Sequence, residues 1–178
     1  MKKTLTYLLL LASLAFWHQS ALYAKPKSAG AVFCFSGIGL SYEHTVDNES
    51  FLDFTLRAEM AELFLGREEI PGCSFSFTWN TVIKEWLSGE GERVRLYIGP
   101  GAVAGIGKDF RTEYGFFFGL KGKVGVEWLF KRGVCISAGI APVFGQHVVR
   151  MEDSIRMRGY RNGLLYGLAP EIGIKHMF

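Results

Sequence analysis

The chain has 178 residues, with 20 basic and 17 acidic side chains and a formal net charge of +3. Two of the bases, Lys2 and Lys3, belong to an amino-terminal segment that we expect to be removed, so the remaining chain is almost neutral. This near balance argues against a protein that holds nucleic acid through a clustered basic face. The roughly 150 residues that remain are enough for one domain.

The first 24 residues have the parts of a secretory signal peptide. Lys2 and Lys3 form its basic start, residues 5–17 are almost entirely apolar, and Ala21 and Ala24 offer small residues to a signal peptidase. The apolar run is shorter than the roughly 20 residues that a membrane-spanning helix needs. We therefore predict that residues 1–24 are a cleaved signal peptide, with cleavage after Ala24 or Ala21, and that residues 25–178 form the mature domain.

The mature chain contains seven segments in which apolar side chains alternate with polar or small ones. This period of two is typical of strands, and turn residues separate the segments, as in an all-β sandwich or barrel. Residues 51–65 also allow a helix, but their strict alternation favours a strand. The predicted strands are 30–45, 51–65, 73–87, 93–107, 112–130, 134–145 and 164–178.

The longest polar stretch, 146–162, is where we expect the largest loop. Bacterial single-chain barrels have an even number of strands, with eight the smallest, so seven segments leave one strand to be found. We expect it at 147–150 or 154–157, or as a second strand within 25–45. Three cysteines lie inside predicted strands, and we interpret them as small buried or lipid-facing residues rather than disulfide partners: Cys34, Cys73 and Cys135.

The final segment has two contrasting faces and ends on an aromatic residue. A last strand that ends like Phe178 resembles the terminal strand of Gram-negative outer-membrane β-barrels, in which that residue is part of the signal for barrel insertion. The resemblance implies contact with the barrel-insertion machinery. One face carries Leu164, Tyr166, Leu168, Ile172, Ile174 and Phe178, and the other Gly167, Ala169, Glu171, Gly173 and Lys175.

Together with the signal peptide, the repeated alternating segments resemble small outer-membrane barrels of the OmpX or OmpA-barrel type over most of the mature chain. The resemblance implies an antiparallel up-and-down barrel of eight strands embedded in the bacterial outer membrane. It also implies a structural or surface-interaction role without catalysis, contact with outer-membrane lipid, and a surface loop, 146–162, that could meet a partner.

The charged residues of the polar faces predict what fills such a barrel. An eight-stranded barrel is just wide enough for its own side chains, and charges of mixed sign are expected to pair there rather than to line a pore. Aromatic girdles at the membrane surfaces are expected from Trp79, Trp86, Trp128, Tyr114 and Tyr166. The predicted lumen charges are four acids and five bases: Asp53, Arg57, Glu59, Arg95, Lys121, Lys123, Glu127, Glu171 and Lys175.

Three prolines lie inside predicted strands. Because proline cannot donate to a strand ladder, we predict a bulge, a bend or a disrupted ladder position at Pro100, Pro142 and Pro170. The competing interpretation is that they mark strand ends in a shorter sheet, closer to that of a soluble barrel.

Two histidines carry the only hints of chemistry. Some small outer-membrane barrels are lipid acylases or deacylases that use a His with Ser, Asp or Glu. His147 with Ser154, Glu152 or Asp153, and His44 with Glu43 and Ser41, supply those residue types but no nucleophile motif. We therefore favour a solvated loop histidine, and assign no catalytic, cofactor or metal residue.

The alternatives to a non-enzymatic membrane barrel are an envelope lipid-modifying enzyme and a soluble periplasmic lipocalin-like barrel with an apolar ligand. The enzyme requires one of these histidines beside a serine or an acid at a lipid-sized cleft. The soluble barrel requires a lumen lined by Phe, Trp and Leu instead of Lys and Glu.

Overall fold

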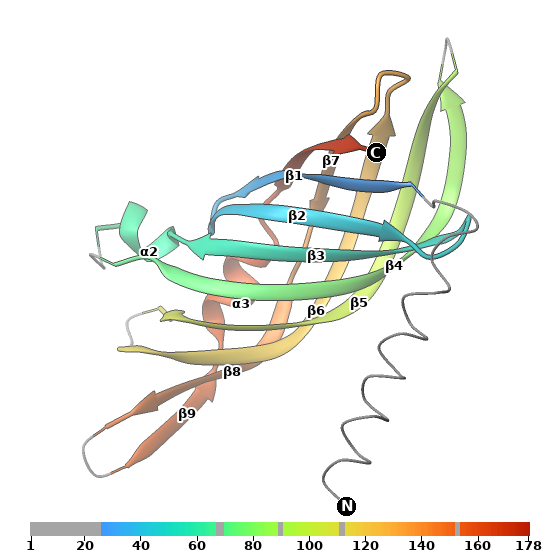
Figure 1. The fold of residues 1–178 in the computed structure, drawn as a ribbon. Coiled ribbons are helices and arrows are strands. Elements are labelled where there is room, and N and C mark those ends of the chain that lie inside the picture. The colour runs from blue at the N-terminus through green and yellow to red at the C-terminus, as the bar shows by residue number, and fades with distance from the viewer. Residues whose placement is uncertain (1–25, 67–69, 89–90, 111–112, 152–153) are drawn as a thin grey trace, which may run out of the picture.

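The computed structural model describes residues 26–66, 70–88, 91–110, 113–151 and 154–178, so the predicted signal peptide lies outside it. Ten strands and two short helices make up this described part (Figure 1). Within these ranges, no helix is long and apolar enough to cross a membrane. The elements are β1 Lys27–Cys34, β2 Gly37–Thr45, β3 Ser50–Glu59, α2 Ala61–Phe64, β4 Gly72–Ser88, β5 Glu92–Lys108, β6 Tyr114–Leu129, β7 Val134–Ile140, β8 Val143–Arg150, β9 Ile155–Gly159, α3 Arg161–Gly167 and β10 Glu171–Met177.

Eight of the strands close into an antiparallel ring. Their order is β5-β4-β3-β2-β1-β10-β7-β6, and pairing between β5 and β6 completes the circle. The first and last strands form the seam, which ends in two hydrogen bonds: the Lys27 amide donates to the Phe178 carbonyl over 3.0 Å, and the Phe178 amide donates to the Lys27 carbonyl over 2.8 Å. The predicted all-β antiparallel barrel is therefore confirmed, and the ring leaves none of its eight strands as a free edge.

Additional strands are present both within residues 25–45 and within the 146–162 stretch, the two regions where the missing strand was predicted. Residues 25–45 form the hairpin β1–β2, and the 146–162 stretch contains most of β8 and all of β9. The expected large loop at 146–162 is therefore wrong: β8 and β9 pair antiparallel from Gln146↔Gly159 to Arg150↔Ile155. The polar character of this stretch predicts a loop. A strand forms there nevertheless, because both faces of β9 are exposed and polar side chains can occupy them without burial.

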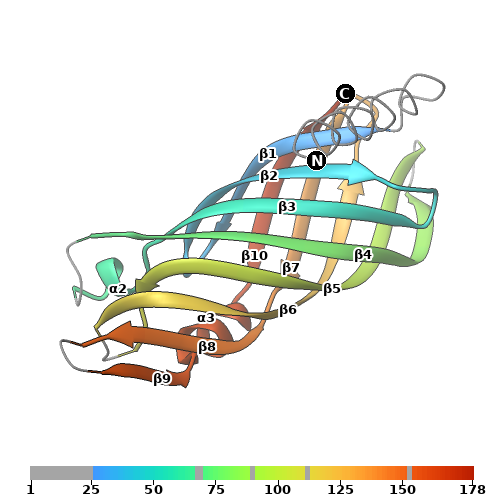
Figure 2. The same cartoon turned by 60° about the horizontal axis from the view of Figure 1, so that its bottom comes forward.

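Strands β7 and β8 are one strand with a break in it. Both pair with β6, through Val124↔Ile140 and Lys121↔Val143, and the Gly122 amide donates across the break to the Pro142 carbonyl over 3.0 Å. Beyond the break, β8 leaves β10 and pairs with β9 instead (Figure 2). The wall is thus closed at one end and carries the extra β8–β9 hairpin at the other.

The last segment is not a single strand from 164 to 178. Residues 161–167 form α3, and only Glu171–Met177 forms β10. A helix replaces the predicted strand here because the first amides of α3 have acceptors outside the helix. The Asp109 carboxylate accepts the Arg161 and Asn162 amides over 3.2 and 2.8 Å. An acid at this position satisfies amides that a helix start leaves without partners.

Two of the three mid-chain prolines, Pro100 and Pro142, lie where a ladder is interrupted, as predicted, whereas Pro170 directly precedes β10 and marks a strand end. Pro142 separates β7 from β8, and Pro170 separates α3 from β10. Pro100 keeps its partner in β6, but the β4–β5 ladder passes from Thr78↔Gly101 to Thr81↔Ile98 without the pairs between them. The strands nevertheless continue past Pro100 and resume after Pro142, so these two prolines do not shorten the sheet.

The two ends of the barrel differ. The connections at 46–49 and 130–133, the end of β4 and the start of β5 lie where β1 begins and β10 stops, which we call the termini end. The opposite end carries α2 and the β5–β6 and β8–β9 connections, and we call it the helical end. Residues 60–65, which the sequence placed in a strand, lie here: β3 stops at Glu59 and α2 follows.

Candidate functional site

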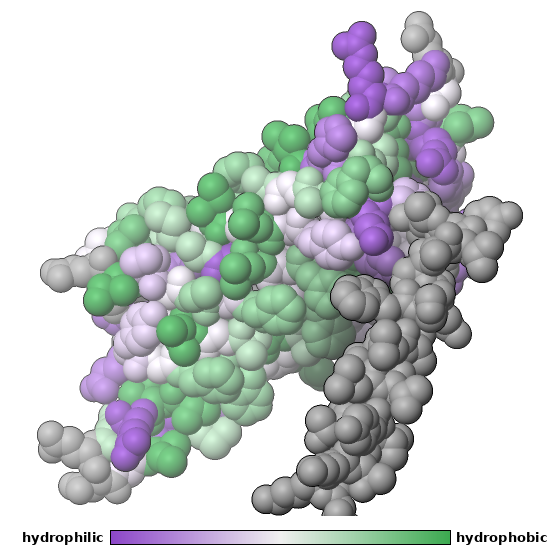
Figure 3. All heavy atoms as spheres, in the orientation of Figure 1, coloured by the Kyte–Doolittle hydropathy of each residue, from purple (hydrophilic) through white to green (hydrophobic). Residues whose placement is uncertain are grey.

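The outer face of the barrel is apolar over its middle. Large hydrophobic side chains project outward from nearly every strand; Leu40 and Leu120 are 68% and 72% exposed. In Figure 3, hydrophobic residues cover much of the visible side, and hydrophilic residues gather toward the ends. Four predicted girdle residues, Trp79, Trp86, Trp128 and Tyr114, are on this outer face, but Tyr166 is buried and contacts Phe35 instead.

The inner face is polar, and its charges form two clusters of ion pairs. The first lies toward the termini end and is centred on Lys175, whose side chain is 0% exposed. Its ammonium group binds the carboxylates of Glu43 and Glu127, the latter at 2.5 Å. Arg95 binds Glu127 from the other side, with its Nε at 2.6 Å. Each carboxylate of this cluster therefore faces a cation.

The second cluster links β3, β6 and β10. Lys123 binds Asp53, and its Nζ also lies 3.2 Å from Glu171. Arg57 binds the other oxygen of Glu171, while the Ser41 hydroxyl donates to Asp53 over 2.8 Å. Because these contacts join strands that are not neighbours, the cluster ties opposite walls of the barrel together.

All nine charges that the sequence placed in the lumen point inward. Glu43 also points into the lumen, which raises the number of lumen charges to five acids and five bases. Its carboxylate accepts from the Ser28 hydroxyl over 2.8 Å. Lys121 donates to Ser76 over 3.0 Å, and Glu59 accepts from Ser74 over 2.5 Å. The predicted ion-paired filling is thus confirmed, and the charges balance.

Above the second cluster, α3 and Tyr160 fill the lumen at the helical end. The Tyr160 ring stacks on Phe117 at a centroid distance of 4.4 Å, and both pack with Val103 and Val143. The Asn162 side chain donates to the Lys108 carbonyl over 3.1 Å. The space left between this plug and the charged cluster is only about 30 Å³, roughly the volume of one water molecule.

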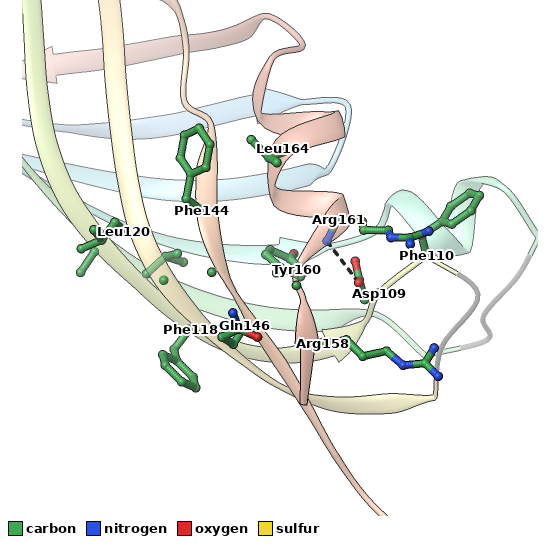
Figure 4. Close-up of a pocket in the computed structure, with 15 residues that line it drawn as sticks. Asp109, Phe110, Phe118, Leu120, Phe144, Gln146, Arg158, Tyr160, Arg161 and Leu164 are labelled. Carbon is green, nitrogen blue, oxygen red and sulfur yellow. Dashed lines mark hydrogen bonds between the residues drawn. The ribbon is translucent and has the colours of Figure 1, made fainter. Parts of the chain in front are cut away.

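A much larger pocket, of about 1270 Å³, lies where β6, β8, β9 and α3 meet. Phe118, Leu120 and Phe144 line it with Leu164 of α3, and Arg158 and Arg161 line it as well. In Figure 4 the two guanidinium groups point away from the apolar side chains. The pocket therefore offers an apolar side and a cationic side.

Among the described residues, neither histidine lies beside its proposed partners. His147 is 1% exposed and lies on β8, so the expectation of a solvated loop histidine is wrong. Its Nε2 lies 3.1 Å from the Gly107 carbonyl, and its ring stacks on Tyr160. Ser154 follows β8 and is exposed, and Glu152 and Asp153 lie outside the described residues.

His44 is separated from its proposed partners by the alternation of β2. Ser41 and Glu43 face the lumen, where they contact Asp53 and Lys175, whereas a strand directs the next residue to the opposite face. Among the residues that the structure describes, no group of three His, Cys, Asp or Glu side chains is arranged to hold a metal ion. The three cysteines are free, with Cys135 buried, Cys34 half-buried and Cys73 exposed.

Comparison of the chain with known proteins adds little to these structural observations. No family model matches the chain, and no curated protein matches it. A solved structure that is similar to it is that of Ail, the attachment invasion locus protein of Yersinia pestis, with 13% sequence identity over 86% of this chain and 97% of that chain and a TM-score of 0.34. The assignment of the fold therefore rests on the strand pairing described above.

Proposed function

We propose that the mature chain is an outer-membrane β-barrel with a structural or surface-interaction role in the cell envelope. The observation that carries this proposal is the inversion of polarity: the wall is apolar outside, and ten balanced charges fill the inside. A soluble barrel has the reverse arrangement. The charged lumen is also unsuited to the apolar ligand of a lipocalin-like protein.

The proposal also gives the barrel an orientation. Outer-membrane barrels have short turns on the periplasmic side and longer loops outside. The termini end has the short connections at 46–49 and 130–133, so we place it in the periplasm. The helical end then faces the outside, and any surface partner is expected at α2 or the β8–β9 hairpin.

The carboxyl terminus supports a route into the membrane. Phe178 is exposed on the outer face, and its backbone hydrogen bonds with Lys27 continue the seam between β1 and β10. We propose that the barrel-insertion machinery recognises this strand before β1 pairs with it.

The experiment that tests the proposal is expression of the whole chain in a Gram-negative host, followed by membrane fractionation and electrophoresis with and without boiling. We expect an outer-membrane protein whose unboiled form migrates differently from the boiled form. Recovery in the soluble periplasmic fraction would overturn the proposal.

A pair of substitutions makes the test sharper. Leu120 and Leu87 are equally exposed, at 72% and 73%, but Leu120 lies in the middle of β6 and Leu87 near the tip of the β4–β5 hairpin. An arginine at the centre of a lipid-facing barrel wall costs about 2–4 kcal/mol, and much less near its edge. We therefore expect Leu120→Arg to reduce the inserted fraction strongly and Leu87→Arg to leave it almost unchanged. Equal behaviour of the two variants would contradict a lipid-facing wall.

A further inference from the structure

The β9 strand differs from every strand of the ring because one of its edges is free. Its side chains still alternate: Arg156 and Arg158 lie opposite the buried residues Val149 and His147, whereas Met157 lies opposite Val148 on the outer side. Side chains of directly paired residues share a face of the sheet. Strand β9 therefore carries Arg156 and Arg158 on the face toward the barrel mouth, and its apolar residues Ile155 and Met157 on the opposite face, which they share with Arg150 of β8.

The pocket beside this edge combines both chemistries. Three glycines on adjacent strands, Gly119, Gly145 and Gly159, line it between the apolar residues of β6 and β8 and the start of α3, and a Cβ atom at Gly159 would meet nothing within 4 Å. Its volume of about 1270 Å³ exceeds the roughly 300–1,000 Å³ of ordinary small-molecule sites. A ligand that fills this pocket and matches its lining is large and amphipathic.

The two guanidinium groups of this pocket, on Arg158 and Arg161, are exposed and form no ion pair with any side chain of the described ranges. The acid that lines the pocket, Asp109, is already engaged, because its carboxylate accepts two amides of the α3 start. The pocket thus has a surplus of positive charge, and guanidinium groups bind phosphate through two parallel hydrogen bonds.

We propose that this pocket binds a phosphate-bearing membrane lipid, with an acyl chain along Phe118, Leu120, Phe144 and Leu164 and the phosphate at Arg158 and Arg161 (Figure 4). The inference rests on the proposed location in a membrane, since the apolar lining continues the lipid-facing wall. A second copy of the chain is a poorer occupant, because two β9 edges paired with each other would bring their arginines together.

The test uses protein extracted from the membrane fraction in dodecyl maltoside and titrated with dioleoyl phosphatidic acid, with bound lipid counted by native mass spectrometry. Dioleoylglycerol supplies the chains without the phosphate, and inorganic phosphate supplies the anion without the chains. We expect phosphatidic acid to bind at least tenfold more tightly than dioleoylglycerol, because charge-assisted hydrogen bonds are lost with the phosphate. Inorganic phosphate should not displace it. Equal binding of the two lipids, or displacement by inorganic phosphate, would overturn the proposal.

Matched variants locate the site. Arg158→Gln with Arg161→Gln should weaken phosphatidic acid binding by about tenfold or more. Arg93→Gln with Arg132→Gln makes the same charge change at the termini end and should have little effect. An equal loss in the two double variants would show a general charge effect and refute the site.

The acyl half of the site has its own pair of variants on α3. Leu164 lines the pocket and Leu165, its more exposed neighbour, does not, so Leu164→Ser should weaken binding and Leu165→Ser should not. Equal effects would contradict the placement of the chain. Heat-modifiable migration of the same samples shows whether each variant is a folded barrel, so loss of lipid binding alone refutes this inference, whereas loss of the membrane form refutes the proposed function.

Discussion

The lumen network can be tested most directly at Lys175, the cation at the centre of the first cluster. Replacement by methionine keeps most of the side-chain volume and removes the charge. Glu43 and Glu127 then remain buried, with Arg95 as their only nearby cation among the described residues; it binds Glu127 closely and lies 3.6 Å from Glu43. Breaking a buried ion pair by removing one partner costs about 3–5 kcal/mol. Lys175→Met should therefore lower the free energy of unfolding by about that amount.

The measurement is urea unfolding of the barrel in lipid vesicles, followed by tryptophan fluorescence. A loss of about 3 kcal/mol changes the unfolding equilibrium by a factor of roughly 100 or more. Lys131→Met, at an exposed residue of the β6–β7 hairpin, is the control and should change stability by less than about 0.5 kcal/mol.

A double variant separates charge from packing. In Lys175→Met with Glu127→Gln, one of the two stranded carboxylates becomes neutral, so part of the lost stability should return, and the two changes should not be additive. If Lys175→Met is no more harmful than Lys131→Met, the lumen charges are not an energetically coupled network and the reasoning fails.

Two further predictions concern the plug and the seam. Asp109→Ala removes the carboxylate that accepts the Arg161 and Asn162 amides, so it should cost about 1 kcal/mol and speed hydrogen exchange in α3 without opening the ring; unchanged exchange would contradict its capping role. Gly30→Ala would place a methyl group 2.0 Å from a backbone oxygen of β10, whereas Gly122→Ala meets nothing within 4 Å, so only the former should reduce the yield of heat-modifiable barrel. Equal yields for the two variants would show that the seam tolerates the clash.

Much of the wall could be predicted because alternation is a local property. Asp53, Lys123 and Glu127 were placed in the lumen from strand parity alone, and all three are paired there. Glu43 is absent from the predicted lumen charges although it lies on the polar face of its segment, because the sequence suggests it only as a possible partner of His44. The parity signal that could have found it was present.

The failures have a common physical origin in contacts between distant parts of the chain. Residues 164–167 belong to the segment whose alternation predicts a strand, but Asp109 supplies acceptors at the start of the helix that forms there. His147 lies in a polar stretch that looks like a loop, yet pairing with β6 and stacking on Tyr160 bury it. No pattern within either segment reports such partners.

By itself, the sequence determined the class of the fold and which face of each strand is polar, because a strand sends successive side chains to opposite sides whatever its partners are. Only the tertiary structure decided how the ring closes, where α3 replaces strand, and which cation meets which carboxylate. Those choices depend on register and on hydrogen-bond partners that come from residues far apart along the chain, such as Glu43 and Lys175.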